Sequence, residues 1–285
     1  MAEVVAKGLG FPEGPVLLPD GRMAFCEETA SRISAFDGNG VKVVAETGGS
    51  PNGATLGSDG KLYVAQNGGV VGDWRAEDMI DPAIQRVGLD GTVETVATEV
   101  GGAKLIAPND ICFGRDGKLY FTDPSQPYDP ENRYEDSRIY ALETNGGAVA
   151  VRRPPVYTNG VGCMPDGRLV WVESYERDVY VLEAGQPRKI GQLPENHLPD
   201  GFAVAEDGRI FLATFISHGI TIISGEGEYL GHIMLDEDAL PSNCAFKGSE
   251  LYVTDVSGYP EDNMAGRLWR IETDAVGMEM NAGTV

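Results

Sequence analysis

Histidine and cysteine are scarce in this sequence of 285 residues. It has three histidines, His197, His218 and His232, and no Gly-x-Ser-x-Gly segment, which disfavours a serine–histidine catalytic triad. Its four cysteines have none of the paired spacings of a zinc site, and each lies in a predicted strand of a different repeat. We therefore expect buried free thiols in a reducing compartment.

Basic residues and long apolar runs are also few. Lysine and arginine together number 22 against 44 aspartates and glutamates, which gives a formal net charge of −22. This charge repels a phosphate backbone and argues against a nucleic-acid partner, while most of the acids serve as a solvated surface. No apolar run has membrane length, and Met1 does not begin a charged and then apolar leader. The sequence therefore predicts no membrane partner and a cytoplasmic location.

One hairpin pattern occurs six times between residues 12 and 255. Each copy has a short polar opening, an alternating apolar strand, a tight turn and a second alternating strand, and five of the turns contain Asp-Gly. The residues that open the six hairpins all have side-chain oxygens: Glu13, Asn52, Asn109, Asn159, Asp200 and Asn243.

A repeat near 40 residues with about four strands per unit is typical of β-propeller blades. We predict an all-β fold, a six-bladed β-propeller of four-stranded antiparallel blades, that fills residues 1–285 as a single domain. The last repeat supplies only three strands, so residues 3–6 are expected to add the fourth strand and close the ring. The residues after Thr273 are expected to form a loose tail.

Extra residues gather in three loops that join the second and third strands of their blades: 68–82, 124–136 and 256–265. Equal steps outward from each Asp-Gly turn place Glu13 opposite Glu28, Asn109 opposite Asp123-Pro124 and Asn159 opposite Ser174. The first strand of each blade lines the central channel of a propeller. The six opening residues are therefore expected to ring one mouth of the channel, with the long loops as its rim or lid.

Four of the ring residues are candidate ligands of a hard cation. Glu13 and Asp200 supply two carboxylates, and Asn109 and Asn159 supply two neutral carbonyl oxygens. An all-oxygen set suits Ca²⁺, Mg²⁺ or Mn²⁺, and four protein ligands leave positions open for water and substrate. A single Asn-Gly is otherwise a turn or an Asx cap, which is the interpretation we favour for the remaining two asparagines of the ring.

Several segments carry a resemblance to a known family: Phe11-Pro12-Glu13-Gly14-Pro15, Pro108-Asn109-Asp110, Tyr120-Phe121-Thr122-Asp123-Pro124, Thr158-Asn159-Gly160 and Pro199-Asp200-Gly201-Phe202. Together they resemble the senescence marker protein/gluconolactonase/luciferin-regenerating enzyme family, over roughly residues 8 to 275. The resemblance implies a six-bladed propeller with one catalytic divalent cation, held by Glu13, Asn159 and Asp200, with Asn109 as a fourth ligand or substrate contact. It also implies hydrolysis of a sugar-acid or other small lactone in carbohydrate metabolism. Ca²⁺ is the expected ion, with Mg²⁺, Mn²⁺ or Zn²⁺ as alternatives in the cell or in an assay.

One position departs from that pattern. Regucalcin-like members place an arginine two residues before the position of Asn109, where this chain has Ala107. A contact to a hydroxyl of the sugar acid is thereby lost or moved to one of the long loops.

The expected mechanism uses the cation as a Lewis acid on the lactone carbonyl and Asp200 as the base that deprotonates the attacking water. Asn109, Trp74 and Tyr128 are expected to contact the substrate. Asp123 is a second candidate base or hydroxyl contact, and a capping role at the end of its strand is an equal alternative.

Three other polar residues near the mouth have plainer interpretations. Glu28 and Glu173 are interpreted as rim acids, and His197 as a surface histidine or a substrate contact. Two other functions also stay open. The same metal site suits a phosphotriesterase-like hydrolase, and a calcium-binding regulatory propeller needs no turnover. The oligomeric state is left open by the sequence.

Overall fold

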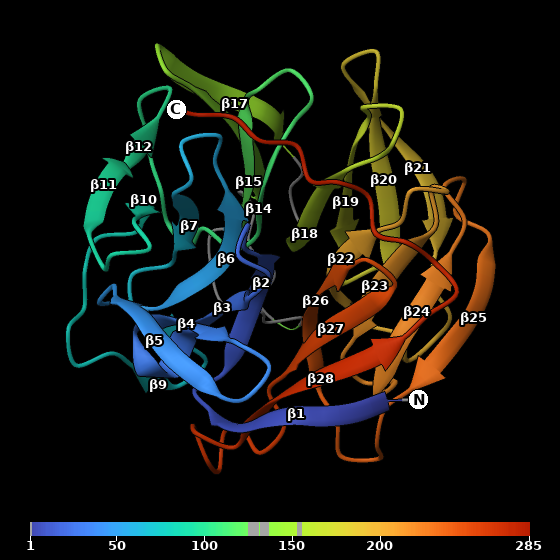
Figure 1. Cartoon of the computed structure of the whole chain (residues 1–285). Coiled ribbons are helices and arrows are strands. Elements are labelled where there is room, and N and C mark those ends of the chain that lie inside the picture. Colours follow the sequence, from blue (N-terminus) through green and yellow to red (C-terminus); the bar gives the residue numbers. More distant parts are fainter. Residues whose placement is uncertain (1, 125–130, 132–136, 153–155) are drawn as a thin grey trace.

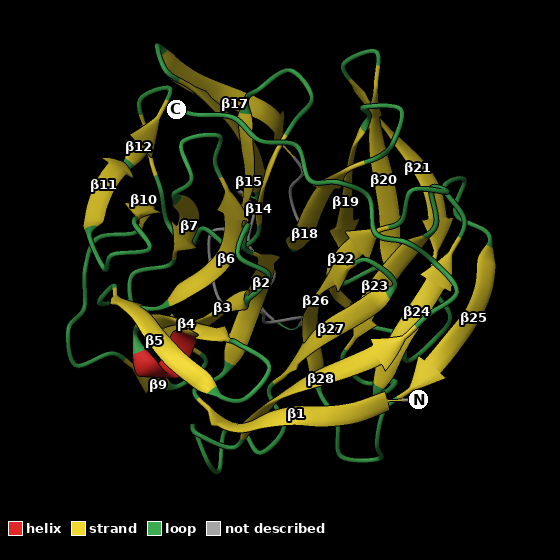
Figure 2. Cartoon of the chain, viewed as in Figure 1, coloured by secondary structure: helices red, strands yellow, loops and turns green. Residues whose placement is uncertain are grey.

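The computed structural model describes residues 2–124, 131, 137–152 and 156–285. Within them, the chain forms six four-stranded antiparallel sheets that stand as blades around a central axis, together with one 3₁₀ helix, η1 (Glu28–Ala30) (Figure 1, Figure 2). This arrangement confirms the predicted six-bladed all-β propeller. In this described part of the chain, no helix has the length and apolar character needed to cross a membrane.

Each blade contributes four strands, counted from the axis outward. The innermost strands are β2 (Pro12–Leu17), β6 (Pro51–Leu56), β14 (Ile111–Phe113), β18 (Thr158–Cys163), β22 (Pro199–Val204) and β26 (Pro241–Lys247). The second strands are β3 (Met23–Glu27), β7 (Leu62–Gln66), β15 (Leu119–Asp123), β19 (Leu169–Glu173), β23 (Ile210–Thr214) and β27 (Glu250–Asp255). The third strands are β4 (Arg32–Phe36), β10 (Ala83–Val87), β16 (Arg138–Glu143), β20 (Asp178–Glu183), β24 (Gly219–Ile223) and β28 (Gly266–Glu272). The outermost strands are β5 (Val41–Glu46), β11 (Val93–Ala97), β17 (Gly146–Arg152), β21 (Gln186–Gln192), β25 (Tyr229–Met234) and β1 (Ala2–Leu9).

The ring is closed by the two ends of the repeat region. β1 pairs antiparallel with β28, with Ala2 opposite Ile271 and Leu9 opposite Gly266. Each innermost strand also contacts the innermost strands of both neighbouring blades, which completes the circle. The predicted closure by the N-terminal strand is therefore confirmed, over a longer segment than expected.

The hydrophobic core is divided among the blade interfaces. Among the described residues, six clusters of buried apolar side chains each draw on two adjacent blades. The middle strands are buried on both faces, which is why β3, β7 and β19 are buried at every position. The four cysteines are free thiols, three of them buried and Cys112 partly exposed, as predicted.

The hairpin turns differ from the predicted geometry. In the first blade, Leu18 N–H donates to Arg22 O and Gly21 N–H donates to Leu18 O, both at 2.9 Å, and Gly21 has a φ of 84°. This is a three-residue loop with its glycine in the left-handed region, whereas the equal-step count assumed a two-residue turn. The predicted register is therefore wrong from the turn outward.

A bulge in five of the six innermost strands, all except β14, shifts the pairing of those hairpins further. The pairing of β2 with β3 is interrupted after Glu13, which lies opposite Cys26 and not Glu28. The cause is crowding at the axis, since a Cβ on Gly14 would lie 2.5 Å from the backbone oxygen of Asn52 in the next blade. Glycine after the opening residue therefore lets adjacent innermost strands approach each other.

Two small two-stranded sheets lie outside the blades: β8 (Val70–Val71) with β9 (Trp74–Arg75), and β12 (Glu99–Val100) with β13 (Ala103–Lys104). The first occupies the long loop of the second blade, and the second lies between the second and third blades. Both hold connecting segments in place at the edge of the ring.

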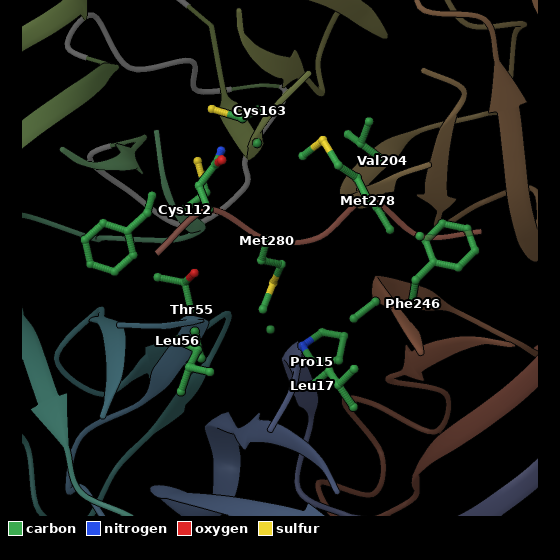
Figure 3. Close-up of a pocket in the computed structure, with 18 of the residues that line it drawn as sticks. Pro15, Leu17, Thr55, Leu56, Cys112, Cys163, Val204, Phe246, Met278 and Met280 are labelled. Carbon is green, nitrogen blue, oxygen red and sulfur yellow. The ribbon is translucent and has the colours of Figure 1, made fainter. Parts of the chain in front are cut away.

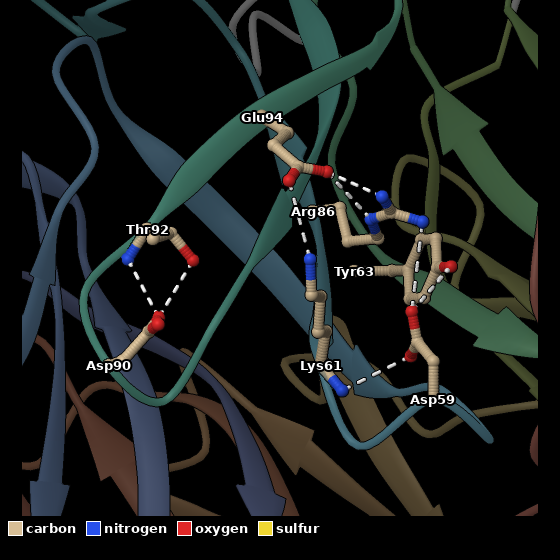
Figure 4. A network of polar contacts seen from close by, with 7 residues as sticks. All are labelled: Asp59, Lys61, Tyr63, Arg86, Asp90, Thr92 and Glu94. Carbon is tan, nitrogen blue, oxygen red and sulfur yellow. Dashed lines mark hydrogen bonds and ion pairs between the residues drawn. The ribbon is translucent and has the colours of Figure 1, made fainter.

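Exposed side chains form a polar network on the second blade (Figure 4). Arg86 Nε donates to Glu94 Oε2 at 3.0 Å, and Lys61 Nζ donates to Glu94 Oε1 at 3.3 Å. Arg86 also lies 3.8 Å from Asp59, which accepts a 3.3 Å hydrogen bond from Tyr63. Exposed ion pairs contribute about 0–1 kcal/mol each, so this network links strands of one blade and adds little to the stability of the ring.

The segment after Thr273 crosses the face of the propeller that carries the hairpin turns (Figure 1). Gly277 N–H donates to Gly248 O and Met278 N–H donates to Val204 O, both at 2.9 Å. Farther along, Ser58 N–H donates to the oxygen of Gly283 at 2.8 Å. The expected loose tail is therefore wrong, because the segment is hydrogen-bonded to three different blades.

Candidate active site

The predicted ring residues gather at the end of the innermost strands that lies away from the turns. Glu13, Asn159 and Asp200 are each the second residue of their strand, and Asn109 precedes β14 by two residues. Glu13 and Asn159 are 3% and 7% exposed, while Asn109 and Asp200 are partly exposed. Burial raises the pKa of Glu13 well above its ordinary value, and the charge of Asp200 adds to the rise. These two carboxylates from different blades therefore lie close enough for the charge of one to affect the other.

Asp110 is a third acid whose charge acts on this pair. Burial, followed by the charge of Asp110, raises the pKa of Asp200, although hydrogen bonding by Asn159 acts in the opposite direction. Burial also raises the pKa of Asp110, to about 6. Ionisation of these acids is therefore costly in the free protein, and a divalent cation between the carboxylates would offset that cost.

Hydrogen bonds fix two of the predicted ligands. Glu13 Oε2 accepts a 2.9 Å bond from Gly14 N–H. Asn159 Nδ2 donates to Ser174 Oγ at 3.2 Å, and Ser174 Oγ donates to Pro199 O at 2.7 Å. The Asn159–Ser174 proximity was predicted from the equal-step count, and it leaves the Asn159 carbonyl oxygen available as a ligand.

Glu28 is not a rim acid. It begins η1 with an exposure of only 2%, and its carboxylate accepts hydrogen bonds from Ser50 Oγ at 2.8 Å, Asn52 Nδ2 at 3.1 Å and Asn67 Nδ2 at 3.0 Å. Burial and then the charge of Glu13 raise the Glu28 pKa. The Asn52 side chain therefore donates to a buried carboxylate, and the predicted turn or Asx cap is wrong. The sequence feature that could have indicated this buried carboxylate is the Glu27-Glu28 pair where β3 meets η1, together with three polar residues at the same end of the next blade.

Asp110 and Asn243 form a second layer below the ring. Pro241 pairs with Asp255 as Pro12 pairs with Glu27, so Ser242 occupies the ring position. Asn243 occupies the next position, which holds glycine in four blades and Asp110 in the third. Placing Asn243 in the ring was therefore wrong. Hydrogen bonding by Asn243 lowers the pKa of both Glu13 and Asp110, which places its amide between these acids.

Asp123 anchors a loop. Its two carboxylate oxygens accept hydrogen bonds from the backbone N–H groups of Ile106 and Ala107, each at 2.9 Å, and the residue is 1% exposed. Asp255, at the same position of another blade, accepts from Leu240 N–H at 2.9 Å. The repeat therefore favours the capping alternative, directed at the preceding loop. A role of Asp123 as base or substrate contact stays a prediction.

Glu173 and His197 also point to structural roles. Glu173 is 1% exposed and accepts a 3.1 Å hydrogen bond from Trp171 Nε1, so it is no rim acid. His197 is partly buried, with its Nδ1 2.7 Å from Thr221 Oγ1 and its ring 4.9 Å from that of His232. These contacts hold His197 against the fifth blade.

Two of the long loops meet beside the first blade. Tyr259 Oη donates to Val71 O at 2.6 Å, and the Tyr259 ring packs edge-on against Phe11 with centroids 4.9 Å apart. Phe11 is two residues from Glu13, so this contact borders the mouth, as expected of a rim. Trp74 is partly exposed in the same loop as Val71, and its substrate contact stays a prediction. Tyr128 lies outside the described residues.

A tyrosine that the sequence did not single out also lies near the acids. Tyr157 directly precedes β18, is 8% exposed and packs edge-on against Tyr175 with centroids 5.7 Å apart. Burial and then the charge of Asp200 raise its pKa. Its phenol is therefore a candidate donor to a hydroxylated substrate.

Among the described residues, no three His, Cys, Asp or Glu side chains form a cluster suited to a metal ion. The predicted ligand set has a different composition, two carboxylates and two amides, and its chemistry fits a hard cation. The observation that supports this fit is that Glu13 and Asp200, at equivalent positions of two innermost strands, both have raised pKa values.

Comparison with known families settles the relationship of this chain. A model of the family described as SMP-30/Gluconolactonase/LRE-like region matches residues 11–257. The chain belongs to this family. This membership confirms the resemblance found in the sequence motifs.

Individual members of the SMP-30/gluconolactonase/LRE-like family are distant. The gluconolactonase of Zymomonas mobilis is 26% identical over 292 residues, which cover 88% of this chain and 78% of that protein. A gluconolactonase structure from Xanthomonas campestris has a TM-score of 0.75 at 23% identity and covers 95% of this chain and 89% of its own. The calcium-binding protein regucalcin from Agrobacterium tumefaciens has a TM-score of 0.78 at 14% identity, with coverages of 99% and 97%. The two structures support the propeller fold.

Proposed function

We propose that this protein is a divalent-metal-dependent lactonase that opens a sugar-acid or other small lactone. The observation that carries the proposal is that Glu13, Asn159 and Asp200 occupy equivalent positions at one end of the innermost strands, where the charge of Asp200 raises the pKa of Glu13. The lactone class is supported by the gluconolactonase relative from Zymomonas mobilis.

Glu13, Asn159 and Asp200 would hold the cation, with Asn109 as a fourth ligand or as a substrate contact. Ca²⁺ suits this set because it accepts carboxylate and amide oxygens in a flexible geometry, and a regucalcin of the same fold is a calcium-binding protein. When bound, such an ion polarises a carbonyl oxygen and lowers the pKa of water.

The chain's own residues supply the proton transfers. Asp200 accepts a proton from the attacking water and returns it to the ring oxygen when the C–O bond of the lactone breaks. Burial favours the protonated form of Asp200, which makes its carboxylate a stronger base than an exposed aspartate. Asn109 and the Tyr157 phenol orient the substrate hydroxyls by hydrogen bonds.

The test is acid release in a pH-stat over a panel of γ- and δ-lactones, with chelator and after addition of Ca²⁺, Mg²⁺, Mn²⁺ or Zn²⁺. Chelator should abolish turnover and at least one of these ions should restore it. Asp200→Ala and Glu13→Gln should each lower kcat/KM by roughly 10²- to 10⁴-fold with an unchanged circular dichroism spectrum. Glu195→Gln, an exposed acid on the loop that leads to β22, is the matched control and should keep full activity.

Other outcomes would replace this proposal. Turnover of phosphotriesters without any lactone would assign the metal site to that reaction. Calcium binding without turnover of either substrate would make the protein a regulatory binding protein. Near wild-type activity of Asp200→Ala would remove its assigned role as the base.

We further infer a setting for the reaction from the same features. Free buried thiols suit the cytoplasm, and a sugar-acid lactone belongs to carbohydrate metabolism. The closed ring of blades supports one domain for the whole chain, with no nucleic-acid or membrane partner expected from its net charge of −22 and lack of long apolar runs.

A further inference from the structure

A cavity of roughly 470 Å³ occupies the channel on the turn side of the ring. Asp110 and Asn243 lie at its inner end, and residues 277–282 of the C-terminal segment cover the opposite end (Figure 3). The cavity and the proposed lactonase site are thus on opposite sides of one layer of side chains. Any ligand of this cavity would be separate from the lactone.

Sulfur is concentrated on the wall of this cavity. Cys112 in β14 and Cys163 at the end of β18 belong to neighbouring blades, and Met278 and Met280 come from the covering segment. Figure 3 shows Cys112 and Cys163 on the same side of the cavity and Met280 extending into its middle. Cys244 in β26 also lines the cavity, so five sulfur atoms from four parts of the chain surround one space.

The two thiols interact directly. Hydrogen bonding from the Cys112 thiol lowers the pKa of Cys163, and the same bond together with burial raises the pKa of Cys112. The Asn281 amide, on the covering segment, also lowers the Cys163 pKa. Its buried Nδ2 has no hydrogen-bond acceptor of ordinary geometry within the described residues. The two thiols therefore lie close enough to influence each other, in a cavity otherwise lined largely by apolar groups.

We propose that Cys112 and Cys163 bind one soft monovalent metal ion of the Cu(I) class, with the Met280 thioether as a third ligand. Thiolate and thioether sulfurs select Cu(I), whereas Ca²⁺ and Mg²⁺ require the oxygens found at the other mouth. Binding forms two Cu–S(Cys) bonds and releases two thiol protons, with no change of oxidation state. Met280 has three rotatable bonds between its Cβ and its methyl group, so its sulfur can reach the pair without a shift of the strands.

The location makes the site sensitive to the covering segment. Cys112 and Cys163 lie on rigid innermost strands, while Met280 and Asn281 lie on a segment fixed mainly by hydrogen bonds to turns. A metal ion on all three sulfurs would tie this segment to the third and fourth blades. Metal binding should therefore protect residues 278–282 from proteolysis.

The test is an anaerobic titration of the reduced, chelator-treated protein with Cu(I), in competition with bicinchoninate. We expect one equivalent of Cu(I) per chain. Cys112→Ser and Cys163→Ser should each weaken binding on the order of 100-fold, and Met280→Leu about 10-fold. The matched control is Cys26→Ser, a buried thiol that does not line the cavity, and this variant should bind as tightly as the wild type.

A second measurement needs no variant. Cu(I) should protect Cys112 and Cys163 from alkylation while chelation restores their reactivity, as read by peptide mass mapping. Tight binding that survives in the Cys112→Ser/Cys163→Ser double variant would overturn the site. Equal affinity for Zn²⁺ would overturn the assigned metal class, and Met280→Leu binding at wild-type affinity would remove the third ligand. Lactone turnover with Ca²⁺ should be unchanged in Cys112→Ser, so this test does not depend on the proposed function.

Discussion

Removal of the divalent cation should reverse the usual dependence of stability on pH. Burial raises the pKa of Asp110 from 3.8 to about 6, so the folded chain holds this proton more tightly than the unfolded chain does. The Asp110 contribution to the stability of the metal-free protein is therefore full below about pH 3.8 and is lost as the pH rises through about 6. Glu13, Glu28 and Asp200 have pKa values raised in the same direction, which extends the loss toward neutral pH.

The size of the effect follows from the Asp110 pKa. A displacement of about two pH units corresponds to roughly 3 kcal/mol, because each unit is worth about 1.4 kcal/mol. For a chain of this size, 1 kcal/mol moves Tm by about 2–4 °C. About 2 kcal/mol of this is lost between pH 4.5 and pH 7.5, because pH 4.5 already lies above the unfolded pKa of 3.8. The metal-free protein should thus lose about 4–8 °C in Tm over this range. A cation at 100 times its Kd would return about 2.7 kcal/mol at the higher pH.

Differential scanning fluorimetry over this pH range, with chelator and with excess Ca²⁺, measures both quantities. Glu13→Gln should flatten the metal-free profile and reduce the response to Ca²⁺, since it removes one of the two interacting charges while its amide oxygen can still accept the Gly14 N–H. Glu195→Gln should reproduce the wild-type profile. A metal-free Tm that rises from pH 4.5 to pH 7.5, together with a Tm that Ca²⁺ does not change, would show that the buried acids do not destabilise the metal-free protein at neutral pH.

Three further changes test other parts of the structure. Asp123→Asn leaves one of two loop N–H groups without an acceptor, so the free energy of unfolding, measured by chemical denaturation, should fall by about 1–3 kcal/mol. The pH profile of kcat should stay unchanged, and a shifted profile would instead make Asp123 a base. Tyr259→Phe removes the 2.6 Å bond to Val71 O and should raise the KM for the lactone several-fold with little change in kcat, whereas an unchanged KM would separate this loop contact from substrate binding. Deletion of residues 276–285 should lower Tm and increase binding of a hydrophobic dye, since it uncovers the cavity, and unchanged dye fluorescence would show that the segment is not its cover.

The periodic features of the sequence were enough to predict the architecture. Repeated hairpins about 40 residues apart, with a last unit one strand short, led to six blades and to closure by β1. The ring of opening residues was predictable for a related reason, because equivalent positions of a repeat occupy equivalent positions around an axis. Glu13, Asn159 and Asp200 were therefore placed at one mouth without any knowledge of their contacts.

Local deviations from the repeat were not predictable in the same way. The bulge at Gly14 arises from the approach of the neighbouring blade, which a count of steps within one hairpin does not include. Asn243 was misplaced because the ring position of its hairpin is held by Ser242, one residue earlier than the oxygen-bearing side chain chosen from the sequence. The buried state of Glu28 depends on polar partners in another blade, and the path of the C-terminal segment depends on turns that are far away in sequence.

The closure of the ring by β1 has a consequence for handling this protein. Eight residues, Ala2–Leu9, are all that cover the outer edge of β28. Proteolytic removal of β1 would expose the unpaired backbone N–H and C=O groups of β28 while the rest of the sixth blade stayed folded. Two trimmed chains would then be able to pair through their exposed β28 edges. An intact chain whose β1 paired with the β28 of a trimmed chain would form a strand-exchanged dimer.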